Sequence, residues 1–218
     1  MLIIHGTYSS SGVRRILVCF FQMGLVEGKE FQVEQVAGFD VLKTPEWMVH
    51  QPFGQMPWME DTETGFELFE ARAICKYAAA KFSSDLLPPA SDIERRALFE
   101  QACSVETQDF DAHATKTAFE CIIKSKLFGL PPDKYLVDWH VEALTGRLDG
   151  YEKILAKTRY LAGDQMTLAD LFHLPAGSYV VGLGLADGMR DGTLPNLTRW
   201  WKELSELKSW AATNAYLP

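Results

Sequence analysis

Short apolar segments of two kinds follow one another in the first eighty residues. Some alternate apolar and polar residues, as half-buried strands do. Others repeat apolar residues every three or four positions, as amphipathic helices do. The predicted elements, in order, are a strand at Leu2–His5, a helix at Val13–Gly24, a strand at Glu30–Gln35, strands at Pro57–Glu60 and Phe66–Phe69, and a helix at Glu70–Lys81. A turn over residues 61–65 joins the last two strands as a hairpin, so residues 1–82 are predicted to form a small α/β domain.

The pattern changes after Ser83–Ser91, where two adjacent prolines among small polar residues indicate a linker. Beyond residue 91 only helical spacing is found. The expected helices run from Asp92 to about Phe119, over Val137–Leu155, onward from Thr167, and over Leu194–Leu207, with a packed tail at Trp210–Tyr216. The chain is therefore predicted to be an α/β domain followed by an all-helical domain over residues 92–218.

The composition narrows the class of protein. With 218 residues, of which 47% are hydrophobic and 23% charged, the chain can bury a sizeable core and is neither disordered nor collagen-like. Twenty-one Lys and Arg residues against 29 Asp and Glu residues give a net charge of −8. No run of basic residues interrupts that balance, so we expect no nucleic-acid partner.

The cellular compartment is also constrained. Leu168–Ala186 is the most apolar long stretch, but it contains Asp170, His173 and Pro175, so we expect a buried helix and no membrane span. The first residues lack the pattern of a signal peptide. The four cysteines stand singly, without the paired spacing of zinc sites. We therefore expect reduced thiols, no metal and a cytoplasmic location.

Candidate chemistry begins in the turn between the first strand and the first helix. Gly6–Gly12 contains several hydroxyl residues where a helix exposes free N–H groups and the positive end of its dipole. Such a position stabilises anions, thiolates included. Capping of the helix by Ser10 or Ser11 is the simpler explanation of one serine, and it is compatible with a functional role.

Three later sites each allow a structural and a functional interpretation. Pro57 is a candidate cis-proline, which would turn the backbone of Met56 outward toward a ligand. Glu70 lies at a strand-to-helix junction, where its carboxylate suits either the helix dipole or a ligand ammonium group. Thr167 and Asp170 have the spacing of a capping box, which we favour over a reactive carboxylate.

Four segments together carry a family resemblance. Beside the serine turn, they are Gln-Pro-Phe-Gly-Gln-Met-Pro at 51–57, Leu-Phe-Glu-Ala-Arg-Ala-Ile at 68–74 and Ala-Gly-Asp-Gln-Met-Thr-Leu-Ala-Asp-Leu at 162–171. In this order and spacing, the chain resembles the serine-type phi class of glutathione transferases over essentially its whole length. The resemblance implies a thioredoxin-like N-terminal domain that binds glutathione as co-substrate, without a metal. It also implies a helical C-terminal domain that receives small hydrophobic electrophiles.

The resemblance implies roles for single residues as well. Ser10 is the implied catalytic residue, donating a hydrogen bond to the glutathione sulfur. The implied glutathione-binding residues are Ser10, Lys43, Gln55, Met56, Glu70 and Ala71. Two positions depart from the family pattern, because Ala71 replaces a serine and Leu42 stands where a histidine is common. Each lost donor predicts glutathione binding weaker by about 1 kcal/mol.

Further expectations concern the second substrate and the assembly. Tyr8 is an alternative sulfur ligand, since other classes use tyrosine, but its position favours the electrophile pocket, together with Phe119 and Tyr179. Phe53 is a candidate anchor of a homodimer. The expected function is detoxification by conjugation, with hydroperoxide reduction as a second reaction. The alternative is a carrier of hydrophobic molecules, a ligandin, with little turnover.

Overall fold

The computed structural model describes residues 1–217, which divide into two compact units. The first unit contains Met1–Leu87 together with the residues from Leu207 onward, and the second contains Pro88–Glu206. The first unit leaves the chain at Leu87, within residues 83–91, and it takes up the C-terminal tail that follows Glu206.

The first unit is built on a four-stranded mixed sheet in the order β2-β1-β3-β4. Strand β1 (Leu2–Gly6) pairs in parallel with β2 (Phe31–Gln35) and antiparallel with β3 (Trp58–Asp61), which forms a hairpin with β4 (Phe66–Phe69). Helices α1 (Ser11–Gln22) and α3 (Ala71–Lys81) complete the β-α-β, β-β-α order. This is the thioredoxin-like arrangement that the sequence implied.

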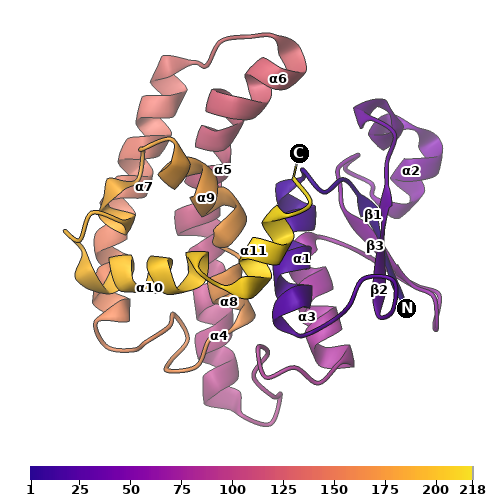
Figure 1. Ribbon diagram of the computed structural model, residues 1–218, viewed down its shortest axis with the longest axis horizontal. Helices are drawn as coiled ribbons and strands as arrows, with labels where there is room; N and C mark the ends of the chain where they lie inside the picture. Colours follow the sequence, from indigo (N-terminus) through magenta and orange to yellow (C-terminus); the bar gives the residue numbers. More distant parts are fainter. Residues whose placement is uncertain (218) are drawn as a thin grey trace. The chain divides into compact units, whose positions relative to one another are not determined.

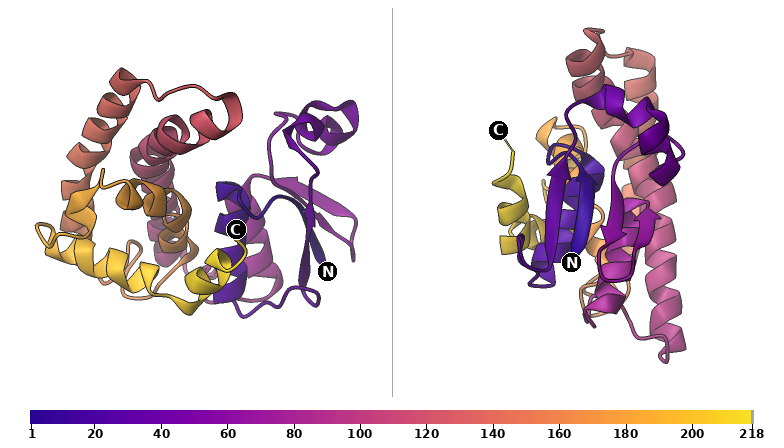
Figure 2. Two further views of the ribbon diagram at one scale, coloured as in Figure 1. Left: turned by 45° about the horizontal axis from the view of Figure 1, so that its top comes forward. Right: turned by 90° about the vertical axis from the view of Figure 1, so that its right-hand side faces the viewer.

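The sheet has helices on both faces (Figures 1 and 2). Helices α1 and α3 lie together on one face. The other face carries the 3₁₀ helix η1 (Phe39–Lys43) and the short helix α2 (Pro45–His50), neither of which the sequence pattern predicted. Under α2 lies a small apolar layer in which Leu42, Trp47 and Trp58 are buried.

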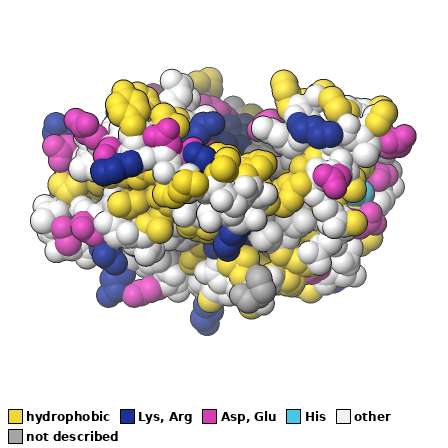
Figure 3. Space-filling model, turned by 90° about the horizontal axis from the view of Figure 1, so that it is seen from above, with side chains coloured by type: hydrophobic (Ala, Val, Ile, Leu, Met, Phe, Trp, Pro, Cys, Tyr) yellow, Lys and Arg dark blue, Asp and Glu magenta, His cyan; other side chains and the backbone are white. Residues whose placement is uncertain are grey.

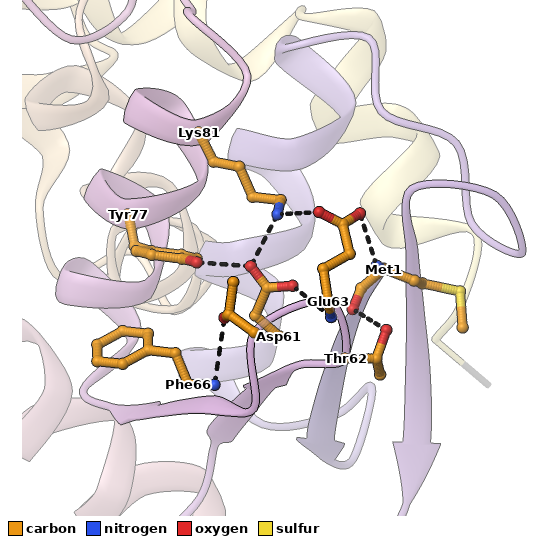
Figure 4. Close-up of polar contacts among 8 residues, drawn as sticks. Met1, Asp61, Thr62, Glu63, Phe66, Tyr77 and Lys81 are labelled. Carbon is orange, nitrogen blue, oxygen red and sulfur yellow. Dashed lines mark hydrogen bonds and ion pairs between the residues drawn. The ribbon is translucent and has the colours of Figure 1, made fainter.

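The β3–β4 hairpin is tied to α3 through the buried carboxylate of Asp61 (Figure 4). This carboxylate accepts hydrogen bonds from the Tyr77 hydroxyl at 2.5 Å and from Lys81 Nζ at 2.8 Å. Burial opposes ionisation, but the hydrogen bonds from Lys81 and Tyr77 outweigh it and hold the pKa of Asp61 below its usual value. The sequence placed Asp61 in the turn, whereas the structure makes it the last residue of β3.

The C-terminal helix α11 (Lys208–Asn214) packs along α1 (Figure 1). Arg14 on α1 donates a hydrogen bond to Asn214 Oδ1 at 2.8 Å, and its guanidinium lies 4.6 Å from the centre of the Trp210 ring. Ser209 donates to the Gln22 side chain at 2.6 Å. Both ends of α1 are therefore held by residues about two hundred positions later in the chain.

The second unit is entirely helical in the part of the chain that the structure describes. One long helical stretch changes its winding along its length, and it extends to Phe128, beyond the predicted end near Phe119. Its segments are α4 (Ile93–Val105), the π-helical turn η2 (Glu106–Asp111), α5 (Ala112–Ala118), a second π-helical turn η3 (Phe119–Ile123) and α6 (Lys124–Phe128). Helix α7 (Lys134–Leu155) packs beside α5.

The remaining helices of this unit include one that carries a buried carboxylate, Asp170. They are α8 (Leu168–Leu171), α9 (Leu174–Gly182), the 3₁₀ turn η4 (Asp187–Met189) and α10 (Pro195–Ser205). Asp170 accepts hydrogen bonds from the backbone N–H of Thr167 at 2.9 Å and from the Trp200 indole at 2.9 Å. The Thr167–Asp170 pair forms a capping box. The apolar stretch 168–186 is thus divided between two short helices.

Across the described residues, no helix combines the length and apolar character that crossing a bilayer requires. On the face drawn in Figure 3, Lys and Arg side chains are scattered among Asp and Glu, with apolar side chains exposed between them.

Candidate functional site

Strand register brings three separate segments to one end of the sheet. His5 pairs with Trp58, and Trp58 pairs with Phe69. The turn after β1, the loop before β3 and the residue after β4 therefore meet at the same edge. These segments contain Ser10, the Gln55-Met56-Pro57 loop and Glu70, so residues predicted to share a site are brought together by the strand pairing.

Ser10 stands immediately before the first residue of α1. Its backbone is extended, with φ −67° and ψ 130°, and its carbonyl accepts the first helical hydrogen bond from Arg14 N at 2.9 Å. The Ser10 side chain, however, makes no capping hydrogen bond. The hydroxyl is half-buried at the positive end of a 12-residue helix and is not used to complete the helix.

Gly12 separates the Ser10 hydroxyl from the cis-proline loop. The Met56–Pro57 peptide bond is cis. A Cβ atom built on Gly12 would lie 2.7 Å from Pro57 Cδ, 3.4 Å from the Met56 carbonyl oxygen and 3.6 Å from Ser10 Oγ. The hydroxyl and the loop backbone therefore approach each other across a position with no room for a side chain.

The loop before Pro57 is held by hydrogen bonds to its backbone. Gln51 accepts from Phe53 N through its side chain at 2.9 Å and from Gly54 N through its carbonyl, also at 2.9 Å. Lys43 Nζ donates to the Phe53 carbonyl at 3.3 Å. Gln55 itself is exposed, so its side chain can reach a ligand.

Glu70 and Ala71 begin helix α3. Glu70 has φ 72° and ψ 109°, a conformation that costs a residue with a side chain on the order of 1 kcal/mol or more. Its side chain does not cap the helix and is exposed. Ala71 is buried, and its N–H is one of the first-turn donors that have no partner within the helix. Backbone strain of this kind is concentrated at ligand sites and active sites.

The Tyr8 side chain is engaged by a carboxylate and by a second tyrosine ring. Its hydroxyl donates to Glu27 Oε1 at 2.8 Å, and its ring stacks on Tyr216 at 4.6 Å between centroids. Burial, together with the Glu27 carboxylate, raises the pKa of the Tyr8 hydroxyl well above its usual value. A hydroxyl committed to a carboxylate in this way is a poor donor to a second anion.

The other predicted positions lie outside this group of segments. Phe119 opens η3 and Tyr179 is on α9, both half-buried within the helical unit. Phe53 is 64% exposed at the tip of its loop. The electrophile pocket and the dimer anchor stay predictions.

Sequence reasoning missed the residues that support the loop from beneath. Trp47 on α2 donates its indole N–H to the Gln55 carbonyl at 2.8 Å. Trp58, directly after Pro57, lies between two imidazole rings, with His5 at 3.7 Å and His50 at 4.1 Å between centroids. The spacing of Trp47, His50 and Trp58 gave no signal, because their contact depends on the fold of η1 and α2.

Comparison with known proteins identifies the family. The model of the glutathione S-transferase N-terminal domain matches residues 12–80, and that of the C-terminal domain matches residues 110–208. The glutathione S-transferase PM239X14 of Arabidopsis thaliana is 37% identical, over 91% of this chain and 88% of its own length. The chain belongs to the glutathione S-transferase family.

Solved structures of transferases agree with this assignment. Glutathione transferase F7 from Populus trichocarpa superposes with a TM-score of 0.89 at 29% identity, over the whole of both chains. Glutathione S-transferase I from maize, solved with an atrazine–glutathione conjugate, gives 0.86 at 30% identity, over 99% of this chain and 97% of its own. These relatives are phi-class transferases, the serine-type class that the sequence resembles. In the described residues, no group of three or more His, Cys, Asp or Glu side chains is arranged to hold a metal ion.

Proposed function

We propose that this transferase binds glutathione at the edge of its sheet and uses the Ser10 hydroxyl to stabilise the thiolate. The observation that supports this most directly is the Ser10 side chain, which stands at the N-terminus of α1 without capping it. A free thiol has a pKa of about 8.5 and is only slightly ionised at neutral pH. Lowering that pKa by one unit requires about 1.36 kcal/mol. One hydroxyl donor to a charged sulfur contributes about 1.5–3 kcal/mol, and the helix end adds up to about 1 kcal/mol.

The rest of the tripeptide is proposed to bind along the same edge. Lys43, whose ammonium group lies beside the loop, would face the glycyl carboxylate. Met56 would pair with the tripeptide through its backbone, and the exposed Gln55 side chain would lie beside it. Glu70 would hold the γ-glutamyl ammonium, and the Ala71 N–H would meet the neighbouring carboxylate.

Two family donors are absent, and the structure shows what one of these positions does instead. Leu42 is buried with Trp47 and Trp58 in the layer beneath the loop. Ala71 offers its N–H but no hydroxyl. Binding of glutathione is therefore expected to be weaker by about 1 kcal/mol for each lost donor. Neither position contacts the sulfur, so the chemistry is retained.

The reaction follows from the thiolate. With an aryl chloride, the sulfur attacks the ring carbon, a carbon–sulfur bond forms, and chloride leaves with the bonding pair. The thiol proton passes to water before the attack. Hydroperoxides are the second class of electrophile that we propose. The apolar part of the electrophile is proposed to contact Phe119, Tyr179 and the Tyr8 ring, and the proposed role of the reaction is detoxification.

The carrier alternative is not favoured, because related transferases have been solved with lactoylglutathione and with an atrazine–glutathione conjugate.

The assembly and compartment are proposed on separate observations. Phe53 is a large apolar residue with an exposed ring, which suits an anchor in a homodimer. None of the four cysteines forms a disulfide in the described residues, which suits the cytoplasm.

Ser10→Ala tests the catalytic proposal. We expect kcat/KM with 1-chloro-2,4-dinitrobenzene to fall by about 30- to 160-fold near pH 6.5, the effect of losing about 2–3 kcal/mol. The midpoint of the pH–rate profile should move upward, because the bound thiol loses a donor. Ser9→Ala is the matched control, since the exposed Ser9 hydroxyl pairs with Thr7, and it should stay within twofold of wild type.

Two outcomes would contradict the proposal. An unchanged pH profile in Ser10→Ala, together with loss of activity in Tyr8→Phe, would transfer the role to Tyr8. Tight glutathione binding without turnover in the wild type would favour the carrier. A thermal shift with glutathione is the first check of binding.

A further inference from the structure

Two buried tryptophans share the apolar layer under α2, but only one of them uses its polar atom. Trp47 Nε1 donates to the carbonyl oxygen of Gln55 at 2.8 Å. Trp58 Nε1 is equally buried and has no hydrogen-bond partner in residues 1–217. The two rings meet edge to face, with centroids 6.2 Å apart and planes at 78°. In this layer the Trp47 indole N–H therefore binds the loop backbone, and the Trp58 indole N–H has no described partner.

The Trp47 ring is fixed before it reaches the loop. Thr44 caps α2, with its hydroxyl accepting from Trp47 N at 3.3 Å, and Pro45 begins the helix with a suitable φ. Only 7% of Trp47 is exposed. A ring held at both its backbone and its faces presents its N–H in one direction, so the hydrogen bond to Gln55 fixes the loop rather than the ring.

The Gln55 carbonyl belongs to the same peptide unit as the Met56 N–H. That unit is trans, since the cis bond of this loop is the next one, Met56–Pro57. In a planar trans peptide the C=O and the N–H point in opposite directions. Drawing the Gln55 oxygen toward Trp47 therefore turns the Met56 N–H away from the α2 layer and leaves it available to a ligand.

We propose that Trp47 is a positioning residue for glutathione, which orients the Gln55–Met56 peptide so that the Met56 N–H can pair with the tripeptide backbone. This inference rests on the proposed function, in which Met56 binds glutathione through its main chain. Past Gln51, the other described backbone hydrogen bonds of the loop end at Phe53 and Gly54, and the hydrogen bond from the Thr7 hydroxyl ends at the Met56 side-chain sulfur at 3.7 Å. Trp47 alone among the described contacts holds the peptide that precedes Met56.

Trp47→Phe is the test, because it keeps an aromatic ring in the layer and removes the N–H. We expect the KM and the calorimetric Kd for glutathione to rise about fivefold, with kcat at saturating glutathione within twofold of wild type. One hydrogen bond of about 1 kcal/mol corresponds to that factor. Trp58→Phe is the matched control, since its N–H has no partner. It should lower the thermal midpoint but leave the Kd for glutathione within twofold.

The outcomes separate this inference from the proposed site. If Gln55→Ala and Glu70→Gln weaken glutathione binding but Trp47→Phe does not, the role of Trp47 is refuted and the site stands. If Trp58→Phe raises the Kd as much as Trp47→Phe, the effect is packing alone and the inference fails. If none of the four variants changes the Kd, the site itself is wrong.

A measurement on the unaltered protein covers the case in which Trp47→Phe does not fold. In ¹⁵N-labelled protein, the indole N–H of Trp47 should exchange more slowly with solvent once glutathione is added. The indole N–H of Trp58 should not change. Equal exchange of the Trp47 signal with and without glutathione would overturn the inference.

Discussion

At the scale of single residues, the candidate site depends on the Ser10 hydroxyl and also on the absence of a side chain at Gly12. Ser10 supplies a hydroxyl, but Gly12 supplies the space in which that hydroxyl and the Met56 carbonyl approach each other. Ser10 and Gly12 stand on either side of Ser11, the first residue of α1. A side chain at Gly12 would press against the ring of Pro57, which is rigid and cannot rotate away.

Gly12→Ala is therefore expected to damage the site. Contact at 2.7 Å with Pro57 Cδ should reduce kcat/KM at least tenfold and lower the free energy of unfolding by about 1–3 kcal/mol. Activity assays and urea denaturation would measure both effects.

Gly150→Ala in α7 is the matched control. A Cβ on Gly150 meets no atom within 4 Å, and the position is an exposed helix interior, so the change should stabilise by about 0.5–1 kcal/mol. Wild-type activity and stability in Gly12→Ala would show that the loop can move aside, against the geometry described here.

At this scale the sequence could indicate candidate residues for the chemistry, and these stay predictions. The motifs placed Ser10, Gln55 and Glu70 in one site, and strand register brings their segments to one edge. The sequence could not distinguish a serine that caps its helix from one that does not, because both occupy the same position. That difference is a side-chain rotation, and only coordinates show it.

At the scale of elements, the most unusual packing is the stack of three rings between strands β1 and β3 and helix α2. His5 and His50 lie on opposite faces of the Trp58 indole, with interplanar angles of 8° and 6°. His50 Nδ1 also lies 2.6 Å from Glu67 Oε2 on β4, and His5 Nδ1 lies 3.5 Å from Glu34 Oε2 on β2. The stack therefore joins every strand of the sheet to the helix that supports the loop before Pro57.

This stack makes stability depend on pH. Burial lowers the pKa of His5, and the positive charge of His50 adds to that, while Glu34, Glu60 and Glu67 partly oppose it. The unfolded chain therefore binds a proton more readily than the folded chain in the region below pH 6.5. The contribution of the neutral His5 to the free energy of unfolding is complete above about pH 6.5 and is lost as the pH falls below that value.

His5→Gln should remove part of this loss of stability at low pH. We expect the free energy of unfolding of the wild type to decline from pH 7.5 to pH 5, and the decline to be shallower in the variant. Denaturation curves at several pH values would show this. His113 and His140 also have lowered pKa values, caused first by burial, so a residual decline is expected. An identical slope in His5→Gln and wild type would mean that His5 does not contribute.

Elements differ in how far a sequence can predict them. Strand β4 and the end of α3 were predicted to the residue, because alternation and a helical stripe are both clear there. Helix α2 was missed because six residues hold too few repeats to show a period. The predicted end of the helix that begins near residue 92 was too early, because the π-helical turns at 106–111 and 119–123 rotate the apolar face of that helix.

At the scale of the whole molecule, the proposed homodimer depends on one exposed ring. Phe53 contacts Phe69 edge to face at 6.1 Å but leaves 64% of its surface exposed. Buried aromatic anchors commonly contribute 2 kcal/mol or more to an interface.

Phe53→Ala is expected to weaken the dimer about 30-fold, which corresponds to about 2 kcal/mol. Sedimentation velocity over a micromolar concentration series would measure it. Phe66→Ala is the matched control, since Phe66 is also an exposed phenylalanine that packs on one ring of its own unit, Tyr77, and it is not a proposed anchor. A wild-type protein that sediments as a monomer, or equal dissociation constants for wild type and Phe53→Ala, would refute the anchor.

The division into units was predictable only in part. Adjacent prolines at 88 and 89 can indicate a linker, but no local pattern tells a short helix which unit it will pack against. Helix α11 was assigned to the helical domain by its position in the chain. Its contacts with Arg14 and Gln22 place it in the other unit.

The return of α11 to α1 has a consequence for biosynthesis. Translation delivers the chain from its N-terminus, so residues 88–206 are all available to one another before Lys208–Asn214 have been added. The unit that begins first in the gene is therefore completed last, and a nascent chain halted before residue 208 would leave one side of α1 uncovered.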